Sequence, residues 1–442
     1  MGIYFFTKLI NIIKYKKFYI IIVLYMTNYA YYDVIIVGGG IAGLYSAYQI
    51  KKLSPKTSIL ILERDKRSWL GGRMNNVDFQ GVSVVTGAGV GRKNKDHLLI
   101  DLCNKLKITY NEFPVKKHYS KTLIPIDIGK IISHLKSKYN KVRDSQKTFK
   151  EFAEPILGKD VYKNLLICSA YTDYENEDAY ETLYYYGFDD NYKSWIALGI
   201  PWHKLVEKLA HKVGMENIKT SSNVVGIHKM DECECGFLVE LSNGKKFTCL
   251  KTIIATTISS VKKLVPGADN PNSIYQQIHG QTFLRVYGKF DKASNEIMKR
   301  EVPTQTIVPG PLHRIIPMNE NKGVYMIAYT DNDGAKQLKD KLENNEKNRE
   351  FFCGLLEKSL GLPSNSLHLK AILDFYWPIG THYYEPLREL FKDRNQFIKA
   401  AQYPMPGMLI VGEMISRKQG WTEGALESVN AVVTKQWIDW KC

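Results

Sequence analysis

The sequence predicts an α/β fold in which one parallel-sheet domain is divided along the chain and carries inserted segments. Three observations predict it. The apolar run DVIIV (33–37) is followed by GGGIAG and then by a helix-patterned segment. A second apolar run, SILILE (58–63), completes a β-α-β unit. A third strand-like run, GMLIVGE (407–413), stands near the other end of the chain, so distant segments must complete the same sheet.

The loop after the first strand carries Gly38, Gly40 and Gly43 in the pattern G-x-G-x-x-G, and Glu63 ends the second strand. In a Rossmann-like unit these glycines allow the tight turn, the approach of a pyrophosphate to the backbone, and the packing of the helix on the strand. The helix start offers free N–H groups to the phosphates, and the acid accepts hydrogen bonds from a ribose. Because a carboxylate disfavours a 2′-phosphate, NAD or FAD is expected rather than NADP.

The other elements follow in order, and none carries a second nucleotide motif. They are a helix-patterned stretch over 95–197, a helix over 199–213, strands over 221–229 and 236–244, a buried strand over 251–257, and alternating strand and helix patterns over 271–398. Insertions into one split domain explain this order better than two consecutive domains. We therefore predict a nucleotide-binding domain from 31–95, 198–270 and 399–442, an inserted α+β substrate-binding domain from 96–197 and 271–398, and an N-terminal extension, 1–30.

Composition excludes several function classes. The 442 residues are 44% hydrophobic and 24% charged, which is ordinary for a globular protein. The formal charge is +16, but the lysines are dispersed and form no basic stripe, so no nucleic-acid partner is predicted. The seven cysteines are scattered, which favours a reducing, cytoplasmic compartment. Cys233 and Cys235 form the only close pair; without a second pair they predict a turn and no metal site.

In the first 26 residues, lysines at 14, 16 and 17 are followed by a nine-residue apolar run, Phe18 to Met26. The run is too short to span a bilayer. It could be the core of a signal peptide or an anchor, yet no convincing cleavage site follows. We favour a translation start at Met26 or a dispensable extension. Membrane association, or a secretory or anchored location, would depend on residues 1–26 acting as a signal.

Together these motifs carry a resemblance to a known family. The segments DVIIVGGGIAGLYSA, ILERDKRSWLGGR, VTGAG, KTIIATT and LIVGEMISRKQGWTEGALES resemble the FAD-dependent amine oxidase family, which includes monoamine and polyamine oxidases, L-amino-acid oxidases and related desaturases. The resemblance runs from about residue 31 to the C-terminus and is most specific at its two ends. It implies FAD as the cofactor, and a small-molecule amine and O2 as partners.

The resemblance also implies cofactor-binding residues. These are Gly38, Gly40 and Gly43 at the pyrophosphate, Glu63 at the adenosine ribose, Gly72 and Arg73 near the phosphates and flavin, Gly87 and Ala88 along the flavin, Val225 through its backbone at the adenine, and Gly412 and Glu413 at the ribityl or pyrophosphate region. Arg64 is also predicted to bind the cofactor, although the spacing from Glu63 to the Gly-Gly-Arg segment is longer than usual in the family. For Val225 and Glu413 a tight turn or a capped helix is the alternative.

A helix that begins near Trp421 and Thr422 would direct its free N–H groups at the flavin. Those groups would favour the negative charge of the reduced flavin. Gly420 and Gly424 would let the backbone approach the ring, since a side chain there would obstruct it. Glu423 is interpreted as an acid that suits the helix N-terminus.

Three residues are predicted to act on the substrate. The resemblance implies two aromatic side chains on the substrate face of the flavin; Trp421 matches one, and Tyr383 is the first choice for the other, with Trp377 as a supporting residue. A lysine is usual near the flavin, but the strand TFLRVYGKF places Arg285 there, with Lys289 as the fallback. Arginine stays protonated, so Arg285 could stabilise an anion or superoxide but could not act as a base.

The predicted function is FAD-dependent oxidation of an amine by hydride transfer to flavin N5, with O2 reduced to H2O2. The alternatives are a desaturase or isomerase of the same fold and an inactive FAD-binding interaction protein, which the arginine at 285 keeps open. The substrate stays undecided. Acids in YTDYENEDAYE (171–181) would suit a polyamine, although such a run is more often a solvated face, and Arg314 or Arg285 would suit the carboxylate of an amino acid.

Overall fold

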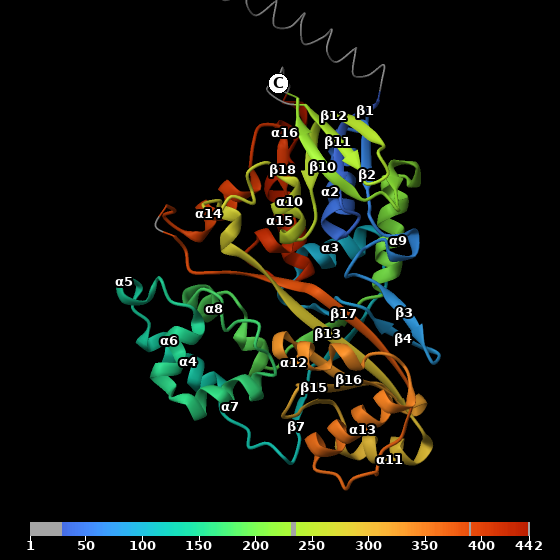
Figure 1. Cartoon of the computed structure of the whole chain (residues 1–442), viewed down its shortest axis with the longest axis vertical. Coiled ribbons are helices and arrows are strands. Elements are labelled where there is room, and N and C mark those ends of the chain that lie inside the picture. The colour runs from blue at the N-terminus through green and yellow to red at the C-terminus, as the bar shows by residue number, and fades with distance from the viewer. Residues whose placement is uncertain (1–28, 231–235, 389, 441–442) are drawn as a thin grey trace, which may run out of the picture.

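The computed structural model describes residues 29–230, 236–388 and 390–440. Within them, seven strands form the sheet that contains the strand directly before the glycine loop (Figure 1). Its strands are β10 (Val224–Lys229), β11 (Phe237–Leu241), β12 (Lys246–Ile254), β1 (Ala30–Val37), β2 (Ile59–Leu62), β9 (Ile218–Lys219) and β18 (Met408–Ile410). β18, β12, β1, β2 and β9 are parallel neighbours, while β10 and β11 are antiparallel. The predicted α/β fold class is confirmed.

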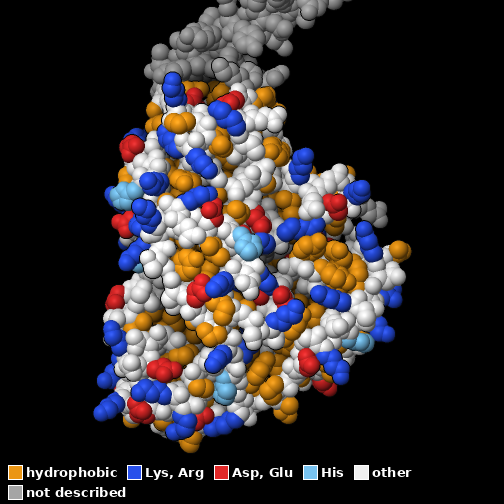
Figure 2. Space-filling model, turned by 180° about the vertical axis from the view of Figure 1, so that it is seen from behind, with side chains coloured by type: hydrophobic (Ala, Val, Ile, Leu, Met, Phe, Trp, Pro, Cys, Tyr) orange, Lys and Arg blue, Asp and Glu red, His pale blue; other side chains and the backbone are white. Residues whose placement is uncertain are grey.

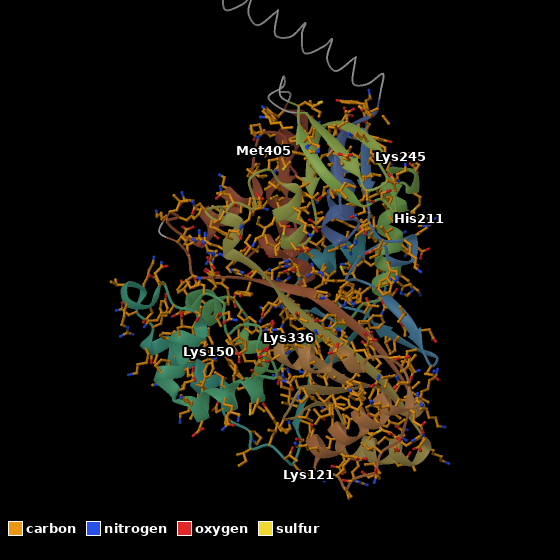
Figure 3. All side chains as sticks on the ribbon, viewed as in Figure 1. Lys121, Lys150, His211, Lys245, Lys336 and Met405 are labelled. Carbon is orange, nitrogen blue, oxygen red and sulfur yellow. The ribbon has the colours of Figure 1, made fainter. Side chains whose placement is uncertain are left out.

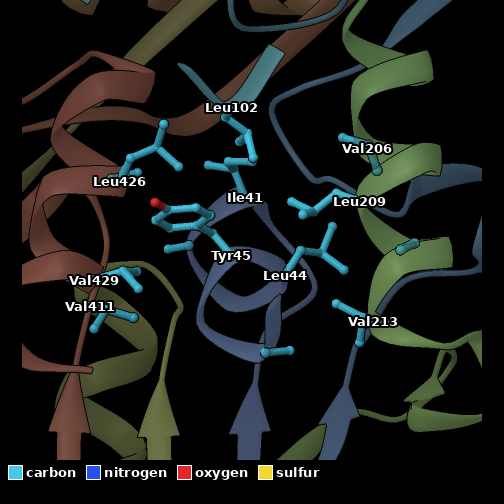
Figure 4. Close-up of a cluster of buried hydrophobic side chains, with 14 of the residues drawn as sticks. Ile41, Leu44, Tyr45, Leu102, Val206, Leu209, Val213, Val411, Leu426 and Val429 are labelled. Carbon is cyan, nitrogen blue, oxygen red and sulfur yellow. The ribbon is translucent and has the colours of Figure 1, made fainter. Parts of the chain in front are cut away.

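Helix α2 (Ile41–Leu53) follows β1 directly and is held between two other helices, α9 (Trp202–Val213) and α15 (Thr422–Val432) (Figure 4). Leu44 of α2 faces Leu209 and Val213 of α9, while Tyr45 lies on the side of α15. The other helices of this part are α3 (His97–Lys105), α10 (Ile258–Leu264), α14 (Arg394–Gln402) and α16 (Lys435–Asp439). Because α2 is buried on both sides, its N-terminus keeps one orientation over the end of β1.

A second, mixed sheet lies below the first (Figure 1). Its strands, in spatial order, are β17 (Leu369–Tyr384), β13 (Ile278–Phe290), β16 (Val324–Asp331), β15 (Arg314–Asn319), β14 (Gln305–Ile307) and β7 (Lys117–Tyr119). Helices α11 (Lys292–Glu301), α12 (Asn332–Leu338) and α13 (Glu346–Leu360) pack on it around a separate apolar core. The long strands β13 and β17 run from this sheet up to the first, so they connect the two halves.

A helical lobe and two small sheets complete the described part of the chain. The lobe contains α4 (Ile128–Lys138), α5 (Lys141–Asp144), α6 (Phe149–Leu157), α7 (Lys159–Ser169) and α8 (Ala179–Tyr184). The small sheets are β3 (Asn76–Phe79) with β4 (Val82–Val85), and β5 (Gly91–Arg92), β8 (Ile196–Gly199) and β6 (Asn111–Pro114). The strands of the first sheet come from the three segments that the sequence groups as the nucleotide-binding domain; the exact domain boundaries stay a proposal.

The basic side chains are distributed widely. On the face shown in Figure 2, Lys and Arg are interspersed with acidic and apolar side chains. In Figure 3, the labelled Lys121, Lys150 and Lys245 lie in well-separated parts of the molecule. No helix among the described residues is long and apolar enough to cross a bilayer, and those residues contain no cluster of three His, Cys, Asp or Glu side chains that could hold a metal ion. The Cys233–Cys235 turn, Cys442 and residues 1–26 lie outside the described residues.

Candidate functional site

One large cavity runs between the two halves, with a volume of about 1440 Å³. Ligand pockets usually measure roughly 300–1,000 Å³, so this cavity can accommodate more than one small molecule. Its wall begins at the glycine loop after β1, passes the segments around Arg73, Gly87 and Glu413, and ends at β13, β15 and β16 of the second sheet. The cavity therefore lies between the two sheets, which the sequence assigns to the nucleotide-binding domain and to the substrate-binding domain.

The three motif glycines have separate physical roles. Gly38 has a φ of +108°, and a Cβ there would lie 2.5 Å from the carbonyl oxygen of Ala255, the residue directly after β12. A Cβ on Gly43 would collide with the Gly38 carbonyl oxygen. A Cβ on Gly40 would meet nothing within 4 Å, because Gly40 lies in the cavity wall. Gly38 and Gly43 thus build the turn, and Gly40 leaves space for a ligand.

The start of α2 suits an anion. Gly40 caps the helix without a side-chain hydrogen bond, and the next two residues, Ile41 and Ala42, line the cavity. The first N–H groups of a helix have no partner within the helix, and its dipole is positive at this end. Gly72, whose φ is +59°, lies opposite, with its Cβ position 4.0 Å from the Gly40 Cα. Backbone donors and free space therefore coincide where a pyrophosphate is expected.

Glu63 lies at the edge of the cavity and is buried. The Gly39 N–H donates to one carboxylate oxygen at 2.6 Å and the Asp65 N–H to the other at 2.8 Å. Each oxygen keeps acceptor capacity for a ligand hydroxyl. Arg64 also lines the cavity, but its side chain is 70% exposed and pairs with Asp65 at 3.3 Å. Glu63 is therefore the stronger candidate for contact with a ribose.

Val225, which the resemblance assigns to the adenine, lies outside the cavity wall. Val225 is 50% exposed and does not line the cavity, whereas its neighbour Val224 is buried and does. Successive side chains of a strand point to opposite faces, and the β10–β11 register shifts between Val224 and Gly226. The side chain of Val224, rather than that of Val225, therefore faces the cavity, and the predicted backbone contact of Val225 with an adenine stays a proposal. Ser222 and Asn223 share the inner wall with Val224.

Glu413 is the centre of a buried polar network at the middle of the cavity. Arg73 donates to its Oε1 at 2.8 Å and His382 approaches the same oxygen at 2.6 Å through Nδ1. The Gly420 N–H donates to Oε2 at 2.9 Å, and Gly420 has a φ of +76°, a left-handed conformation that favours glycine. The Glu413 carboxylate thereby orients both Arg73 and the turn that leads into Trp421.

The His382 tautomer follows from its other contact. The Ile258 N–H donates to Nε2 at 3.2 Å, so Nε2 holds the lone pair and Nδ1–H donates to Glu413. Burial by itself would raise the pKa of Glu413, but His382, Arg73 and the Gly420 N–H together lower it to about 2. Glu413 is therefore a carboxylate at any physiological pH.

The segments that the sequence assigns to the flavin lie along the same wall. A Cβ on Gly87 would collide with the Arg73 carbonyl oxygen, and the Ala88 N–H donates to that oxygen at 2.8 Å. Gly412, with a φ of +135°, donates its N–H to the Ser428 hydroxyl at 2.8 Å. Gly87, Ala88 and Gly412 all line the cavity. These close backbone contacts leave a smooth, glycine-rich surface against which a flat ring can lie.

Trp421 stands at the predicted helix start, since α15 begins at Thr422 and Trp421 is its N-cap. Both residues line the cavity. The guanidinium carbon of Arg92 lies 3.5 Å from the centre of the Trp421 ring. Asp96 holds that guanidinium by hydrogen bonds of 3.0 and 2.7 Å. A cation–π contact anchored in this way keeps the indole in one orientation.

Trp377, rather than Tyr383, lines the cavity together with Trp421. Trp377 lines the cavity and donates its indole N–H to the Thr86 carbonyl at 2.7 Å. Tyr383, the predicted partner of Trp421, does not line this cavity. Its ring stacks on His279, 5.1 Å away, because the two residues are directly opposite in the β13–β17 pair. β17 leaves the cavity before it reaches Tyr383.

Arg285 lies on β13 with its side chain in the cavity wall. It donates to the carbonyl of Gly87 and lies 4.2 Å from the ring centre of Tyr329, its cross-strand neighbour on β16. Lys289 does not line the cavity; it donates to the Lys322 carbonyl. Four residues of strand separate Lys289 from Arg285 by about 13 Å, so the fallback lysine is too far along β13.

The far end of the cavity collects ionisable side chains. Arg314 and Asp173 line it together with Lys117. The acidic run 171–181 is not a solvated face, because Glu177, Asp178 and Glu181 are buried; Asp178 pairs with Arg394 at 3.1 Å. Of the acids in this run, only Asp173 reaches the wall of the large cavity. The run therefore supplies one carboxyl to the cavity rather than a line of charges.

Several residues in the cavity wall, and Arg92 behind Trp421, carried little signal in the sequence. His382 is the single histidine in the mostly apolar and aromatic strand β17, which is the one feature that could have drawn attention to it. Arg92 precedes its partner Asp96 by four residues, as many surface pairs do. Tyr329 and Lys117 are single residues on strands of the second sheet. Their relevance depends on which way each side chain faces, which the pairing of strands decides.

Comparisons with known proteins agree with this arrangement. Residues 36–106 match the NAD(P)-binding Rossmann-like domain family, and residues 133–432 match the family of flavin containing amine oxidoreductases. An uncharacterized protein of Acanthamoeba polyphaga mimivirus is 37% identical over 57 residues, which is 13% of this chain and 11% of that relative. The match thus spans about a tenth of the curated relative's length.

Two solved structures of putrescine oxidase share the fold. A double mutant redesigned in its cofactor binding superposes with a TM-score of 0.72 at 14% identity, covering 91% of this chain and 98% of that one. The wild-type enzyme bound to putrescine gives a TM-score of 0.70 at 13% identity over the same shares of the two chains. At this identity the likeness shows the fold alone. The family match over 133–432 is the decisive finding: the chain belongs to the flavin-containing amine oxidoreductase family.

Proposed function

We propose that this protein is an FAD-dependent oxidase of a small amine. One observation carries the proposal. A single cavity contains the glycine loop at one end, with Gly40 in its wall, and Trp421, Trp377 and Arg285 at the other. A nucleotide bound at the loop would extend toward these side chains, so cofactor and substrate would meet without a separate channel.

The residues of the wall fit such a cofactor. The space at Gly40 and the uncapped start of α2 suit a pyrophosphate, and the Glu63 carboxylate suits ribose hydroxyls. Arg73, fixed by Glu413, would hold the middle of the cofactor, and the N-terminus of α15 would face the flavin. Bound FAD would accept a hydride equivalent from the carbon next to the substrate nitrogen and pass the electrons to O2, which yields H2O2.

The protein's own part in this reaction is positioning and exclusion of water. Trp421, held by Arg92, and Trp377, held by Thr86, provide two rigid aromatic walls. Such walls desolvate a substrate and limit its orientations. Arg285 remains a cation, so it cannot take a proton from a substrate ammonium, but it can stabilise negative charge that develops beside it. The substrate amine must therefore lose its proton to another group or enter neutral.

The reducing compartment predicted from the cysteines also stays a proposal. Cys103, Cys168, Cys249 and Cys353 are free and buried. Burial raises the pKa of the Cys103 and Cys249 thiols, so these groups are protonated and unreactive at neutral pH. Four inert, unpaired thiols support a cytoplasmic location.

The test has two stages. The purified protein should show flavin absorbance bands, and anaerobic addition of a panel of amines, polyamines and amino acids should bleach those bands with at least one member. Admission of air should then restore the bands and release H2O2. Bound flavin that no member of the panel bleaches would contradict the oxidase and favour the interaction protein, the alternative that Arg285 leaves open. Bleaching that is not followed by H2O2 in air would favour a desaturase, which passes the electrons to another acceptor.

A further inference from the structure

Two arginines at the substrate end of the cavity share one aromatic ring. Arg285 and Arg314 both line the cavity, and both are buried, at 6% and 5% exposure. Their guanidinium carbons lie 4.2 and 5.5 Å from the ring centre of Tyr329. Two like charges are thus gathered around one side chain, an arrangement that costs free energy unless an anion is also present.

Neither arginine has a carboxylate partner within 4.0 Å among the described residues. Arg314 donates to the Tyr171 hydroxyl at 3.0 Å and to the Ser169 carbonyl at 3.2 Å, which are neutral acceptors. Arg285 contacts the Gly87 carbonyl and, at 3.7 Å, the sulfur of Met326.

Three other arginines within the described residues, the buried Arg92 and Arg394 and the partly buried Arg73, have carboxylate partners. Arg92 contacts Asp96 at 2.7 Å, Arg394 contacts Asp178 at 3.1 Å, and Arg73 contacts Glu413 at 2.8 Å. The protein therefore supplies counter-ions for its structural arginines and leaves the two in the substrate chamber without one. The difference indicates that the missing negative charge arrives with a ligand.

Two acids line this part of the wall, and neither compensates. Asp190 is already paired with Lys95 at 2.6 Å and with Arg92 at 3.4 Å. Asp173 is hydrogen-bonded by the Tyr186 hydroxyl at 2.6 Å, and burial together with Asp331 raises the pKa of Asp173 to about 8. At pH 7 this carboxyl is largely protonated. Lys117, which donates to the Asn191 side chain at 3.1 Å, adds a third basic group; burial and Arg314 lower its pKa to about 7. The chamber is therefore positive overall.

We infer that the substrate is an amine that carries a carboxylate, and that Arg314 binds this carboxylate beside Tyr329. The inference rests on the proposed function and names the substrate class for the same site. A planar carboxylate matches the donor fork of a guanidinium, and the low dielectric of the chamber strengthens the pair. Arg285 lies nearer the Gly87–Gly89 segment. With its carboxylate on Arg314, the substrate would direct its amine end toward Trp421. A polyamine, which carries only positive charge, is disfavoured by the same groups.

The test uses ligands that cannot be oxidised. Pentanoate and its neutral isostere pentanamide would be titrated into the flavin-loaded protein, with binding followed by calorimetry and by the flavin spectrum. We expect pentanoate to bind at least tenfold more tightly than pentanamide. This comparison needs no variant, so it holds even if a substitution at Arg314 fails to fold.

Variants then locate the anion. Arg314→Gln should weaken pentanoate binding at least tenfold and leave pentanamide binding within twofold, while Arg314→Lys should retain an intermediate affinity. Arg300→Gln, which removes an exposed guanidinium on α11 that pairs with Glu301 at 3.0 Å, is the matched control and should change neither value. Equal affinity for pentanoate and pentanamide in the unaltered protein, or an undiminished preference in Arg314→Gln, would overturn the proposal.

The outcome also separates this inference from the proposed function. If putrescine bleaches the flavin, amino acids do not, and pentanoate fails to bind, the amine oxidase stands and the carboxylate site is wrong. If pentanoate binds through Arg314 but no amine of any class bleaches the flavin, the anion site stands and the oxidase is wrong. Bleaching by carboxylate-bearing amines, with an Arg314→Gln effect confined to KM, would support both.

Discussion

Gly40 and Gly43 stand three residues apart in one loop, yet the absence of a side chain has a different purpose at each. Gly40 has an ordinary φ of −71°, and a methyl group there would project into open cavity. Gly43 lies inside α2, where a methyl group would strike the backbone of Gly38. One glycine therefore serves the ligand and the other serves the packing of helix on strand.

This difference predicts distinct effects of two alanine substitutions. Gly40→Ala should leave the melting temperature of the cofactor-free protein within about 1 °C, while reducing FAD affinity at least tenfold. Gly43→Ala should itself lower the free energy of unfolding by about 1–3 kcal/mol, because overpacking forces the backbone to shift. Thermal melting of the apo proteins and flavin titration would measure both. A Gly40→Ala protein that binds FAD normally would contradict the role given to Gly40.

At the scale of elements, the position of α2 depends on its neighbours. The helix lies between α9 and α15, and its buried side chains pack against both (Figure 4). In α9, the pattern of buried residues, Leu205, Val206, Leu209 and Val213, follows the helical repeat. The face of α9 that meets α2 therefore fixes where the N-terminus of α2 points into the cavity.

Leu209→Ala should destabilise the protein by about 2–5 kcal/mol, since it removes a fully buried side chain and leaves a cavity beside α2. Lys212→Ala, on the exposed face of the same helix, is the control and should change stability by less than about 0.5 kcal/mol. Urea denaturation of both variants would measure the difference. Equal effects would show that α9 does not support α2 through this face.

At the scale of the whole molecule, Glu413 joins segments that are far apart in the chain. Its carboxylate binds Arg73, 340 residues earlier, and His382 on β17, and it also accepts the N–H of Gly420. The contacts link the segment after strand β2 of the first sheet, strand β17 of the second sheet, and the turn before α15. The site is therefore complete only when both halves of the protein are assembled.

The pH dependence of stability should report this network. The pKa of Glu413 falls from an ordinary 4.5 to about 2 in the folded state. A depressed pKa contributes stability that is fully present above pH 4.5 and is lost as the pH falls through about 2. Glu413→Gln should therefore be less stable than the unaltered protein at pH 7, and the difference should shrink as the pH is lowered below 4.5.

The matched control is Glu427→Gln, whose carboxylate forms an ion pair with Lys418 at 2.6 Å on the surface of α15. Exposed pairs contribute about 0–1 kcal/mol, so this variant should differ little from the unaltered protein at any pH. Denaturant titrations between pH 3 and pH 7 would compare the three proteins. A Glu413→Gln difference that stays constant across this range would show that ionisation of Glu413 is not the source of its effect.

Much of the fold was predictable because its signals are local. The first strand, the glycine loop, α2 and the strand that ends at Glu63 form one continuous stretch, so their patterns can be interpreted without the rest of the chain. The start of α15 at Thr422 was equally accessible. By contrast, Tyr383 was placed by its neighbourhood in sequence, and the register of β13 with β17 turned it onto His279 instead.

The sequence by itself thus determined the fold class and the family, because glycine spacing, apolar runs and helix starts are written in consecutive residues. Only the tertiary structure decided which side chains form the cavity wall: Val224 in place of Val225, Trp377 in place of Tyr383, and His382 behind Glu413. For Val224 and Val225 the physical reason is the two-residue repeat of a strand, in which a shift of one position exchanges the inner and outer faces. For Tyr383 it is the path of β17, which leaves the cavity after His382, and for Glu413 it is a contact between segments far apart in the chain. The tertiary structure also places Arg285 and Arg314 against the ring of Tyr329. Neither has a carboxylate partner among the described residues.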